Sequence, residues 1–329
     1  MRIRALYAVG FLPIAAASGA WAQATSTSSG QVFPAKPVEL VVHTSAGGGG
    51  DLFARTVAEI ITREKLLPQP LVVSNKAGGG GTIAFSYVAG KRGDPYTLLA
   101  VPSTVLLTAP LRSGLDIGLD KFTPLASLGL DLNGVTVRAD APYATFTDFV
   151  EAAKREPNSI VIGFGSIGGT GHYLAYQLEK VTGARFRAVP MKGAQAVLSV
   201  LGGHVHATTE NLSEGLGLIE AKKLRVLGIA ADRRLPTIPD VPTLQELGYA
   251  VQAGTIRGFV FPAGVPKEAA TIMETALERA HTTPAWKEHA ARNFYLDVYM
   301  GSAEFSQFLA KRLEEARGFY NDIGLGSKP

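Results

Sequence analysis

Two glycine-rich turns carry the clearest chemistry in this sequence. The first is TSAGGGGD, residues 44–51, and the second is GSIGGTGH, residues 165–172. Each follows a short apolar run and precedes a helical pattern, so each presents backbone N–H groups and the positive end of a helix dipole to whatever lies in front. Such turns bind anions. Two of them, far apart in the chain, predict one anionic ligand held from two sides.

The side chains within the two turns have more local roles. Asp51 follows four glycines and is interpreted as the N-cap of the helix, a structural role rather than a ligand contact. The second turn adds hydroxyl groups at Ser166 and Thr170. We expect His172, at the start of its helix, to make a local hydrogen bond or to line a cleft rather than to act as a base.

Motifs for catalysis and for cofactors are incomplete. Gly163 to Gly168 matches G-x-G-x-x-G, but no suitably placed acid follows, and no nucleotide-triphosphate loop occurs. A hydrolase elbow needs G-x-S-x-G, and Phe164 stands where Ser166 requires the first glycine. His204 and His206 could share one strand face, but no third metal ligand accompanies them. We therefore expect no cofactor, no metal and no catalytic set.

The turns must be positioned by alternating strands and helices. In the first half we expect a strand at 38–43, a helix at 51–65, a strand at 71–74, a glycine turn leading to a helix that ends near 89, and a strand at 96–101. In the second half we expect strands at 135–138, 160–164, 186–190, 204–208, 224–230 and 258–262, and helices at 146–155, 171–182, 194–201, 243–247, 267–282 and 303–322. Alternation of this kind predicts parallel strands joined by crossover helices, with ligands at the carboxyl ends of the strands.

Composition and length restrict the class of protein. Residues 1–22 have a charged start, an apolar run and an Ala-Trp-Ala end, which predicts a signal peptide cleaved after Ala22 and a periplasmic location. A polar, flexible leader is expected at 23–35. The remaining length, from a chain of 329 residues, favours two lobes. The chain has no cysteine, which excludes thiol chemistry, and its positive charges are scattered, so no nucleic-acid partner is expected.

Taken together, the segments resemble the tripartite tricarboxylate transporter substrate-binding proteins, the Bug receptors, over nearly all of residues 36–325. The segments that carry the resemblance are Gly47-Gly48-Gly49 with Asp51, Asn75 to Thr82, Tyr96-Thr97-Leu98-Leu99, Gly165 to His172, Lys192-Gly193, Leu201 to Val205, Leu224 to Leu227, Leu235 to Thr243 and Pro262 to Pro266. The order and spacing of these segments together are specific for the family, although no single segment is specific by itself.

The resemblance implies an α/β fold: a two-lobe periplasmic binding protein of type II, a Venus flytrap, in which each lobe has a mixed, mainly parallel sheet flanked by helices. Lobe 1 would comprise 36–132 plus 256–329 and lobe 2 would comprise 133–255, with crossings near 130–135 and 253–258. The implied ligand-binding residues are Ser45, Ala46, Gly47, Gly48, Gly49, Gly50, Asp51, Gly81, Thr82, Ser103, Thr104, Ser166, Ile167, Gly168, Gly169, Thr170, Gly171, His172 and Lys192.

The implied function is non-catalytic capture of a small carboxylate, either a di- or tricarboxylate or an aromatic acid. The partners would be the transporter's membrane subunits, or a sensor, and the receptor is expected to be a monomer. An exported hydrolase using Ser166 and a receptor for phosphate esters remain as alternatives. Three positions depart from the family pattern: Thr44-Ser45-Ala46 replaces prolines, His206 replaces an acid, and Ile256 replaces an aromatic residue. The backbone grip on a carboxylate does not depend on these side chains, but recognition of the ligand's far end does.

Overall fold

The structure is a computed structural model that describes residues 33–191 and 195–326. The expected signal peptide, the leader as far as residue 32 and Lys192 lie outside the described residues. The strands of the first sheet are β1 (Val38–Val42), β2 (Leu71–Asn75), β3 (Thr97–Pro102), β4 (Phe122–Leu132), β10 (Gly254–Pro262), β11 (Tyr295–Leu296) and β12 (Met300–Gly301). The strands of the second are β5 (Gly134–Arg138), β6 (Val161–Phe164), β7 (Arg187–Pro190), β8 (Ala207–Thr208) and β9 (Leu224–Ile229).

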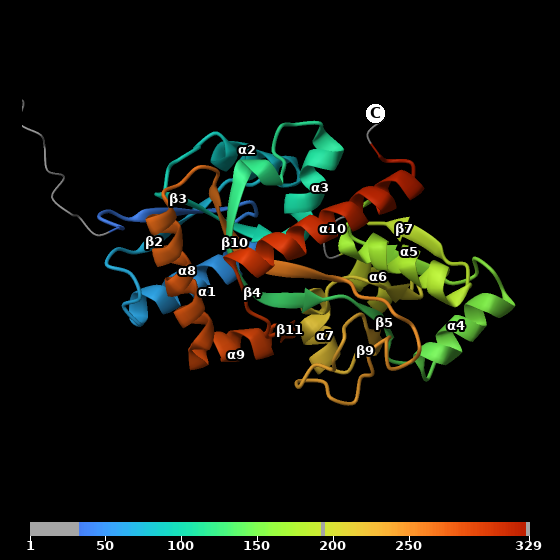
Figure 1. The fold of residues 1–329 in the computed structure, drawn as a ribbon. Helices are drawn as coiled ribbons and strands as arrows, with labels where there is room; N and C mark the ends of the chain where they lie inside the picture. Colours follow the sequence, from blue (N-terminus) through green and yellow to red (C-terminus); the bar gives the residue numbers. More distant parts are fainter. Residues whose placement is uncertain (1–32, 192–194, 327–329) are drawn as a thin grey trace, which may run out of the picture. The chain divides into compact units, whose positions relative to one another are not determined.

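The two sheets repeat one strand order (Figure 1). The first sheet runs β11-β4-β10-β3-β1-β2, with β12 also paired to β4, and the second runs β7-β6-β8-β5-β9. In both, three parallel strands (β2-β1-β3 and β7-β6-β8) are followed by an antiparallel strand, β10 or β5. The expected mixed sheets are therefore confirmed, but parallel pairs are confined to these trios. Sheet one is completed by antiparallel pairs of β4 with β10, β11 and β12.

The chain passes between the sheets twice. It leaves the first sheet at Leu132, the last residue of β4, and β5 begins at Gly134. It returns after β9, through the segment that leads into β10 at Gly254. Because β4 and β10 pair along their whole length, from Gly254 with Leu132 to Pro262 with Phe122, the two passages lie side by side.

Helices cover both sheets. The helices beside the first sheet are α1 (Gly49–Arg63), α2 (Thr82–Ala89), α3 (Ser103–Ser113), α8 (Lys267–Thr282), α9 (Pro284–Arg292) and α10 (Ser302–Asp322). The helices beside the second are α4 (Phe146–Arg155), α5 (Thr170–Thr182), α6 (Gln195–Leu201) and α7 (Leu216–Glu220). None of the helices in the described residues is long and apolar enough to cross a bilayer.

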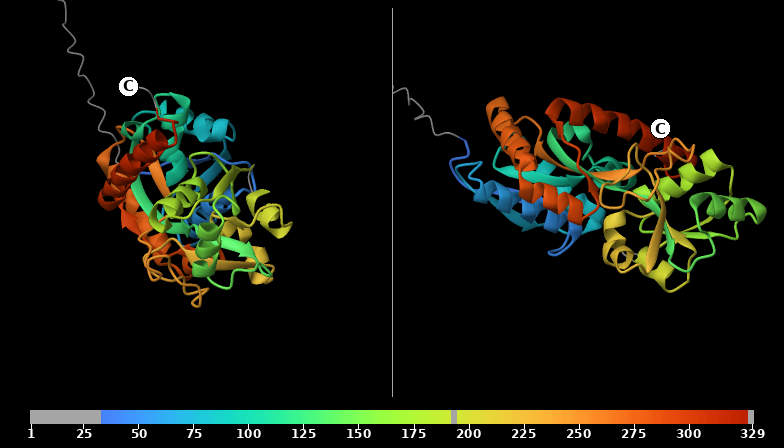
Figure 2. Two further views of the ribbon diagram at one scale, coloured as in Figure 1. Left: turned by 90° about the vertical axis from the view of Figure 1, so that its right-hand side faces the viewer. Right: turned by 90° about the horizontal axis from the view of Figure 1, so that it is seen from below.

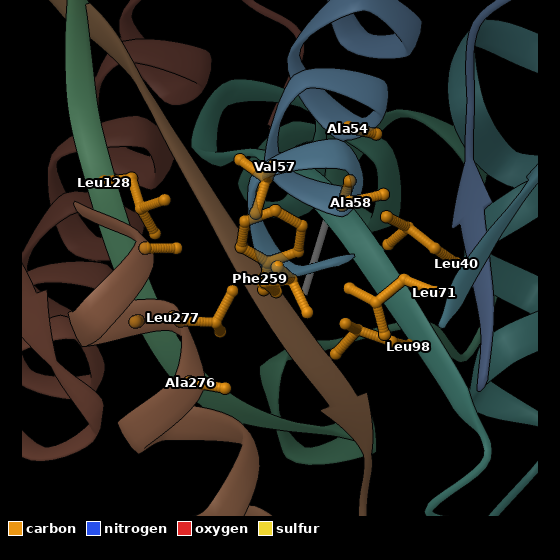
Figure 3. Close-up of a cluster of buried hydrophobic side chains, with 14 of the residues drawn as sticks. Leu40, Ala54, Val57, Ala58, Leu71, Leu98, Leu128, Phe259, Ala276 and Leu277 are labelled. Atoms are coloured by element: carbon orange, nitrogen blue, oxygen red, sulfur yellow. The ribbon is translucent and has the colours of Figure 1, made fainter. Parts of the chain in front are cut away.

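Strand alternation divides the first core into two layers. Leu40 and Leu98 pack under α1 and α8 with Phe259, as Figure 3 shows. Their neighbours Val41 and Leu99 point to the other face and pack with α2, α3 and α10. Both faces of the central strands are buried, which explains why these strands read as continuous apolar runs rather than as alternating ones.

Four expectations about elements are corrected. The expected order has no element between residues 102 and 134, yet the structure has α3 and the long strand β4 there. Pro110 lies inside α3 and Pro124 inside β4, and prolines in these places argue against both elements in a sequence. The strand expected at 204–208 is only Ala207–Thr208, and the helix expected at 243–247 is a series of turns. Helices α7 and α9 and the short strands β11 and β12 were also not expected.

Candidate ligand-binding site

The second glycine turn ends in helix α5, for which Gly169 is the N-cap. Its N-terminal loop is held by its own atoms: Gly169 N–H donates to the Ser166 carbonyl at 3.0 Å, and Gly168 N–H donates to His172 Nδ1 at 3.1 Å. The His172 ring stacks on Phe164 with centroids 4.4 Å apart. Burial lowers the pKa of His172, which keeps the ring neutral and able to accept this bond. The expected local role of His172 is thus present in the structure.

The N–H groups that remain for a ligand lie in the first turn of α5. In any α-helix the first N–H groups have no acceptor within the helix. No side chain caps α5, whose first residues are Thr170, Gly171 and His172. An anion in front of this turn would also meet the positive end of the α5 dipole.

The first glycine turn is stabilised from within by Asp51, and its expected role as N-cap is wrong. The N-cap is Gly48, and helix α1 begins at Gly49, so Asp51 lies in the first turn and is 1% exposed. Its carboxylate accepts from Gly47 N–H at 2.8 Å, from Arg55 at 2.9 Å and from Asn75 at 2.9 Å. The hydrogen bond from Arg55, together with those from Gly47 and Asn75, outweighs burial and lowers the pKa of Asp51 to about 2. Asp51 therefore fixes the turn, and both of its carboxylate oxygens are engaged within the protein.

A cavity of about 70 Å³ lies between α3, α5 and α10. Its volume is several times the ~10–15 Å³ that one water molecule requires. The lining residues are Ser103, Thr104, Leu107, Thr108, Gly168, Gly169, Thr170, Tyr173, Gln252, Ala253, Gly254, Phe308, Arg312, Glu315, Ala316 and Phe319. The N-terminal ends of α3 and α5 both open onto this cavity, although they belong to different sheets. Five expected site residues thereby meet: Ser103, Thr104, Gly168, Gly169 and Thr170.

The α3 end of the cavity is attached to the strand that returns from the second sheet. Ser103 Oγ accepts the N–H of Ile256 at 3.0 Å, and the hydroxyl oxygens of Thr104 and Thr255 are 3.1 Å apart. Thr255 in turn donates to Asn211 at 3.3 Å, next to β8. The α3 N-terminus is therefore positioned directly by the passage between the sheets, so a change in that passage would move one wall of the cavity.

Helix α10 forms the remaining wall and joins the two sheets. Near its start, Ser302 bonds to the Pro124 carbonyl at 2.8 Å, and Phe305 is buried in the first core. Near its end, Phe319 packs against Tyr173 and His172 of α5. Figures 1 and 2 show the helix, in red, running between these two regions. Where α10 faces the cavity, Arg312 is paired with Glu315 at 2.6 Å, so this cation already has an anion.

The other expected site residues that the structure describes do not line the cavity. Ser45, Ala46 and Gly47 are exposed, Gly81 packs near His43 and Val105, and Thr82 bonds to the Gly79 carbonyl. Ser166 and Ile167 line a separate hollow of about 420 Å³ with Leu111 and Leu325. Gly49 is also exposed, and it brings the first turn near a cation, because a Cβ there would lie 3.9 Å from Arg257.

Arg257 begins a row of charged groups that leads from the first turn toward the second, and sequence reasoning missed most of this row. Arg257 forms an ion pair with Asp131 at 2.7 Å, with side chains 13% and 0% exposed. Ser213 donates to Asp131 at 2.9 Å, and Glu214 and Glu210 follow. A signal for Glu210 was available, because it directly follows a parallel strand, where side chains meet ligands.

Among the described residues we find no arrangement of side chains suited to metal binding or to nucleophilic catalysis. No group of three or more His, Asp or Glu residues there could hold a metal ion. His206 is exposed, but its Nδ1 accepts the Val161 N–H at 3.0 Å and is therefore engaged within the protein. Glu179, the acid that follows the G-x-G-x-x-G segment along the chain, accepts the Phe186 N–H at 2.7 Å at the far end of α5.

Two sheets of one strand order, joined by two passages and with helix N-termini facing a shared cavity, define a solute-binding protein of the periplasmic type. Known proteins agree. The chain is 32% identical to a TctC solute-binding protein from Polaromonas. The two structures superpose over 88% of this chain and 100% of the Polaromonas chain, with a TM-score of 0.77. It is 25% identical to R. palustris Rpa4515, solved with adipate, over 89% of this chain and 99% of that one with a TM-score of 0.77.

The sequence comparisons name the family. The model for the tripartite tricarboxylate transporter family receptor matches residues 53–325, and the chain belongs to this family. Protein BugT of Bordetella pertussis is 29% identical over 90% of this chain and 92% of its own length. The resemblance to the Bug receptors is thereby confirmed, as is the two-lobe α/β fold it implied.

Proposed function

We propose that this protein is a periplasmic receptor that captures a small carboxylate in the cavity between α3, α5 and α10, without catalysis. The observation that carries the proposal is the convergence of Ser103 and Thr104, at the α3 N-terminus, with Gly169 and Thr170, at the α5 N-terminus, on one cavity. A carboxylate placed there receives N–H groups from two helix ends, and charge-assisted bonds of this kind strengthen as water is excluded.

The rest of the lining indicates what the carboxylate is attached to. Leu107, Tyr173, Phe308 and Phe319 provide an apolar wall. The one cation on the wall, Arg312, is already neutralised by Glu315. These features favour an aliphatic dicarboxylate or an aromatic acid over a densely charged tricarboxylate. That the R. palustris relative was solved with adipate supports the aliphatic choice.

The proposal includes the route of the ligand. Residues 1–22 would be removed after Ala22 on export, and the mature receptor would act as a monomer. Lobe 1, comprising 36–132 plus 256–329, and lobe 2, comprising 133–255, would close on the ligand about the two passages, because hinge closure around a ligand needs only a few residues between lobes. The closed receptor would then deliver the ligand to the transporter's membrane subunits or to a sensor.

A thermal-shift screen followed by calorimetry tests the proposal. The panel is adipate, malate, benzoate and citrate, with phenyl phosphate and glycerol phosphate as the competing anions. A ligand that binds only the folded state raises the melting temperature by mass action. We expect adipate or benzoate to give the largest shift. A shift by the phosphate esters alone would identify a phosphate-ester receptor, and hydrolysis of phenyl phosphate would identify an enzyme.

A cavity-filling variant links the shift to this cavity. Ala316→Leu adds three carbon atoms to the α10 wall, and we expect it to weaken binding at least tenfold, which corresponds to about 1.4 kcal/mol. Ala310→Leu, on an exposed position of the same helix, is the matched control and should bind as the parent does. Equal affinity of both variants would place the ligand elsewhere.

A further inference from the structure

The second glycine turn already holds a carboxylate, that of Glu210. Glu210 Oε1 accepts the N–H of Gly165 at 2.6 Å. The same oxygen lies against the other end of the turn, because a Cβ added to Gly171 would be 2.1 Å from it. The side chain therefore reaches from the end of β8 to the first turn of α5. An anion bound by the first N–H groups of α5 becomes a direct neighbour of Glu210.

Glu210 is not the only acid at this place. Glu214, on the short 3₁₀ helix Leu212–Gly215, lies beside Glu210, and the charges of the two carboxyl groups act on each other. Beyond it lies the buried Asp131 on β4, which is paired with Arg257 on β10. From α5 the nearest titratable group is His172, whose ring is neutral. Two other charged groups therefore act on Glu210 and Glu214. They are Asp131 and Arg257, which are paired with each other.

Resting on the proposed function, we propose that Glu210 sets the affinity for the ligand by coupling its capture to the uptake of one proton. Two neighbouring carboxylates repel each other, and a proton on one of them relieves the repulsion. When a ligand carboxylate enters the α5 turn, three carboxyl groups crowd one site, and like charges at such separations cannot all remain ionised. The Glu210–Glu214 pair then takes the proton, and the protonated carboxyl can donate a hydrogen bond where an ionised one repels.

The electrostatics of the unliganded pair agree with this geometry. Burial raises the pKa of Glu210, although the Gly165 N–H acts in the opposite direction. The pKa of Glu214 is raised to about 8, first because the protein around the carboxyl weakens its hydration and then because of the charges of Glu210 and Asp131. Since the Glu214 side chain is still exposed to solvent, we give more weight to the two neighbouring charges. Near neutral pH the pair retains a proton, and above about pH 8 it loses it.

Calorimetry at several pH values tests the inference. The probe is whichever of adipate, malate, benzoate and citrate gives the largest thermal shift. Heats measured at pH 9, where the unliganded pair is largely ionised, in two buffers of different ionisation enthalpy report the protons taken up, and we expect an uptake approaching one. Above the pH at which the pair ionises, linkage makes the affinity fall about tenfold per pH unit.

Variants assign the effect to Glu210. Glu210→Gln removes one charge and keeps an oxygen that can accept the Gly165 N–H, so it should bind the probe with little proton uptake and with a flattened pH profile. Glu214→Gln provides an independent variant with the same expectation. The control is Glu179→Gln, on the same helix, where the carboxylate also accepts a backbone N–H at 2.7 Å but lies at the far end. Its pH profile should match that of the parent.

The possible outcomes distinguish a failure of this inference from a failure of the proposed function on which it rests. Binding without proton uptake, or a Glu210→Gln profile that matches the parent, overturns the inference and leaves the carboxylate receptor standing. If no carboxylate binds the parent between pH 6 and 9, both are overturned. If Glu210→Gln does not fold, as judged by circular dichroism, the proton count for the parent and for Glu214→Gln decides.

Discussion

The hydroxyl of Tyr320 lies 3.5 Å from the carbonyl oxygen of Gly168, which places the C-terminal end of α10 directly on the second glycine turn. Tyr320 is 1% exposed, and a Cβ on Gly168 would lie 2.1 Å from its hydroxyl. At this distance the hydrogen bond is weak, and packing makes the larger contribution. A helix anchored in the first core thus helps to set the position of a turn that belongs to the second sheet.

Gly168→Ala should disturb this contact. Gly168 has φ +79°, a left-handed conformation that costs a residue with a Cβ about 1–2 kcal/mol, and the new methyl also meets a hydroxyl that is buried. We expect the free energy of unfolding, measured in urea, to fall by at least that amount and affinity for the ligand to fall with it. The control is Gly318→Ala, on an exposed position of α10 with no atom near the added Cβ. It should instead be stabilising by roughly 0.5–1 kcal/mol.

Phe319→Ala should release the end of α10 from α5. The Phe319 ring is 4% exposed and contacts His172, Tyr173 and Tyr176. Truncation of a buried phenylalanine costs about 3–5 kcal/mol, which urea unfolding will show. Asp322→Ala removes the neighbouring ion pair with Lys180, whose side chains are about half exposed, and the exposed hydrogen bond from the Tyr176 hydroxyl, and should cost about 1 kcal/mol. Similar losses for the two variants would contradict the view that packing attaches this helix.

Asp131→Ala should destabilise the protein strongly at the first passage between the sheets. Its removal leaves Arg257 nearly buried without the carboxylate that it meets at 2.7 Å. Breaking a buried ion pair from one side costs about 3–5 kcal/mol. Lys154→Ala removes an exposed pair with Glu151 on α4 and serves as the control, with an expected loss of less than about 1 kcal/mol. Chemical denaturation of the three proteins at one pH provides the comparison.

Glu214→Gln should change how stability depends on pH. In the folded state the pKa of Glu214 is about 8, compared with an ordinary value of 4.5. Between these values the folded state binds more protons than the unfolded state, so the contribution of Glu214 to stability falls as pH rises through this window. The glutamine side chain does not ionise, so the variant does not lose stability in this way as pH rises. Its melting temperature should equal that of the parent near pH 4 and exceed it at pH 8 and above. Glu59→Gln, at an exposed position of α1, should show no such pH-dependent difference.

The elements that bear the glycine turns were predictable because local signals and tertiary structure agree there. Strands β1 and β6 are short apolar runs that stop at glycines, and α1 and α5 begin within a residue or two of the expected positions. The elements that were not predicted lie where tertiary burial overrides local propensity. Strand β4 contains Pro124 and Gly129, yet it forms because β10, β11 and β12 pair with it on both sides. No local pattern reports partners that arrive more than a hundred residues later.

By itself the sequence determined the fold family and the chemistry of the site. Glycines before a helix start expose N–H groups whatever surrounds them, and this property is local to the chain. Only the tertiary structure decided which groups meet at the cavity and at the turns. It directed Asp51 inward as a brace, brought Ser103 and Thr104 to the same cavity as Thr170, and placed Glu210 on the turn that was expected to be open to the ligand. The reason is physical: the field and the space at a turn depend on every charge and atom nearby, and most of these belong to distant parts of the sequence.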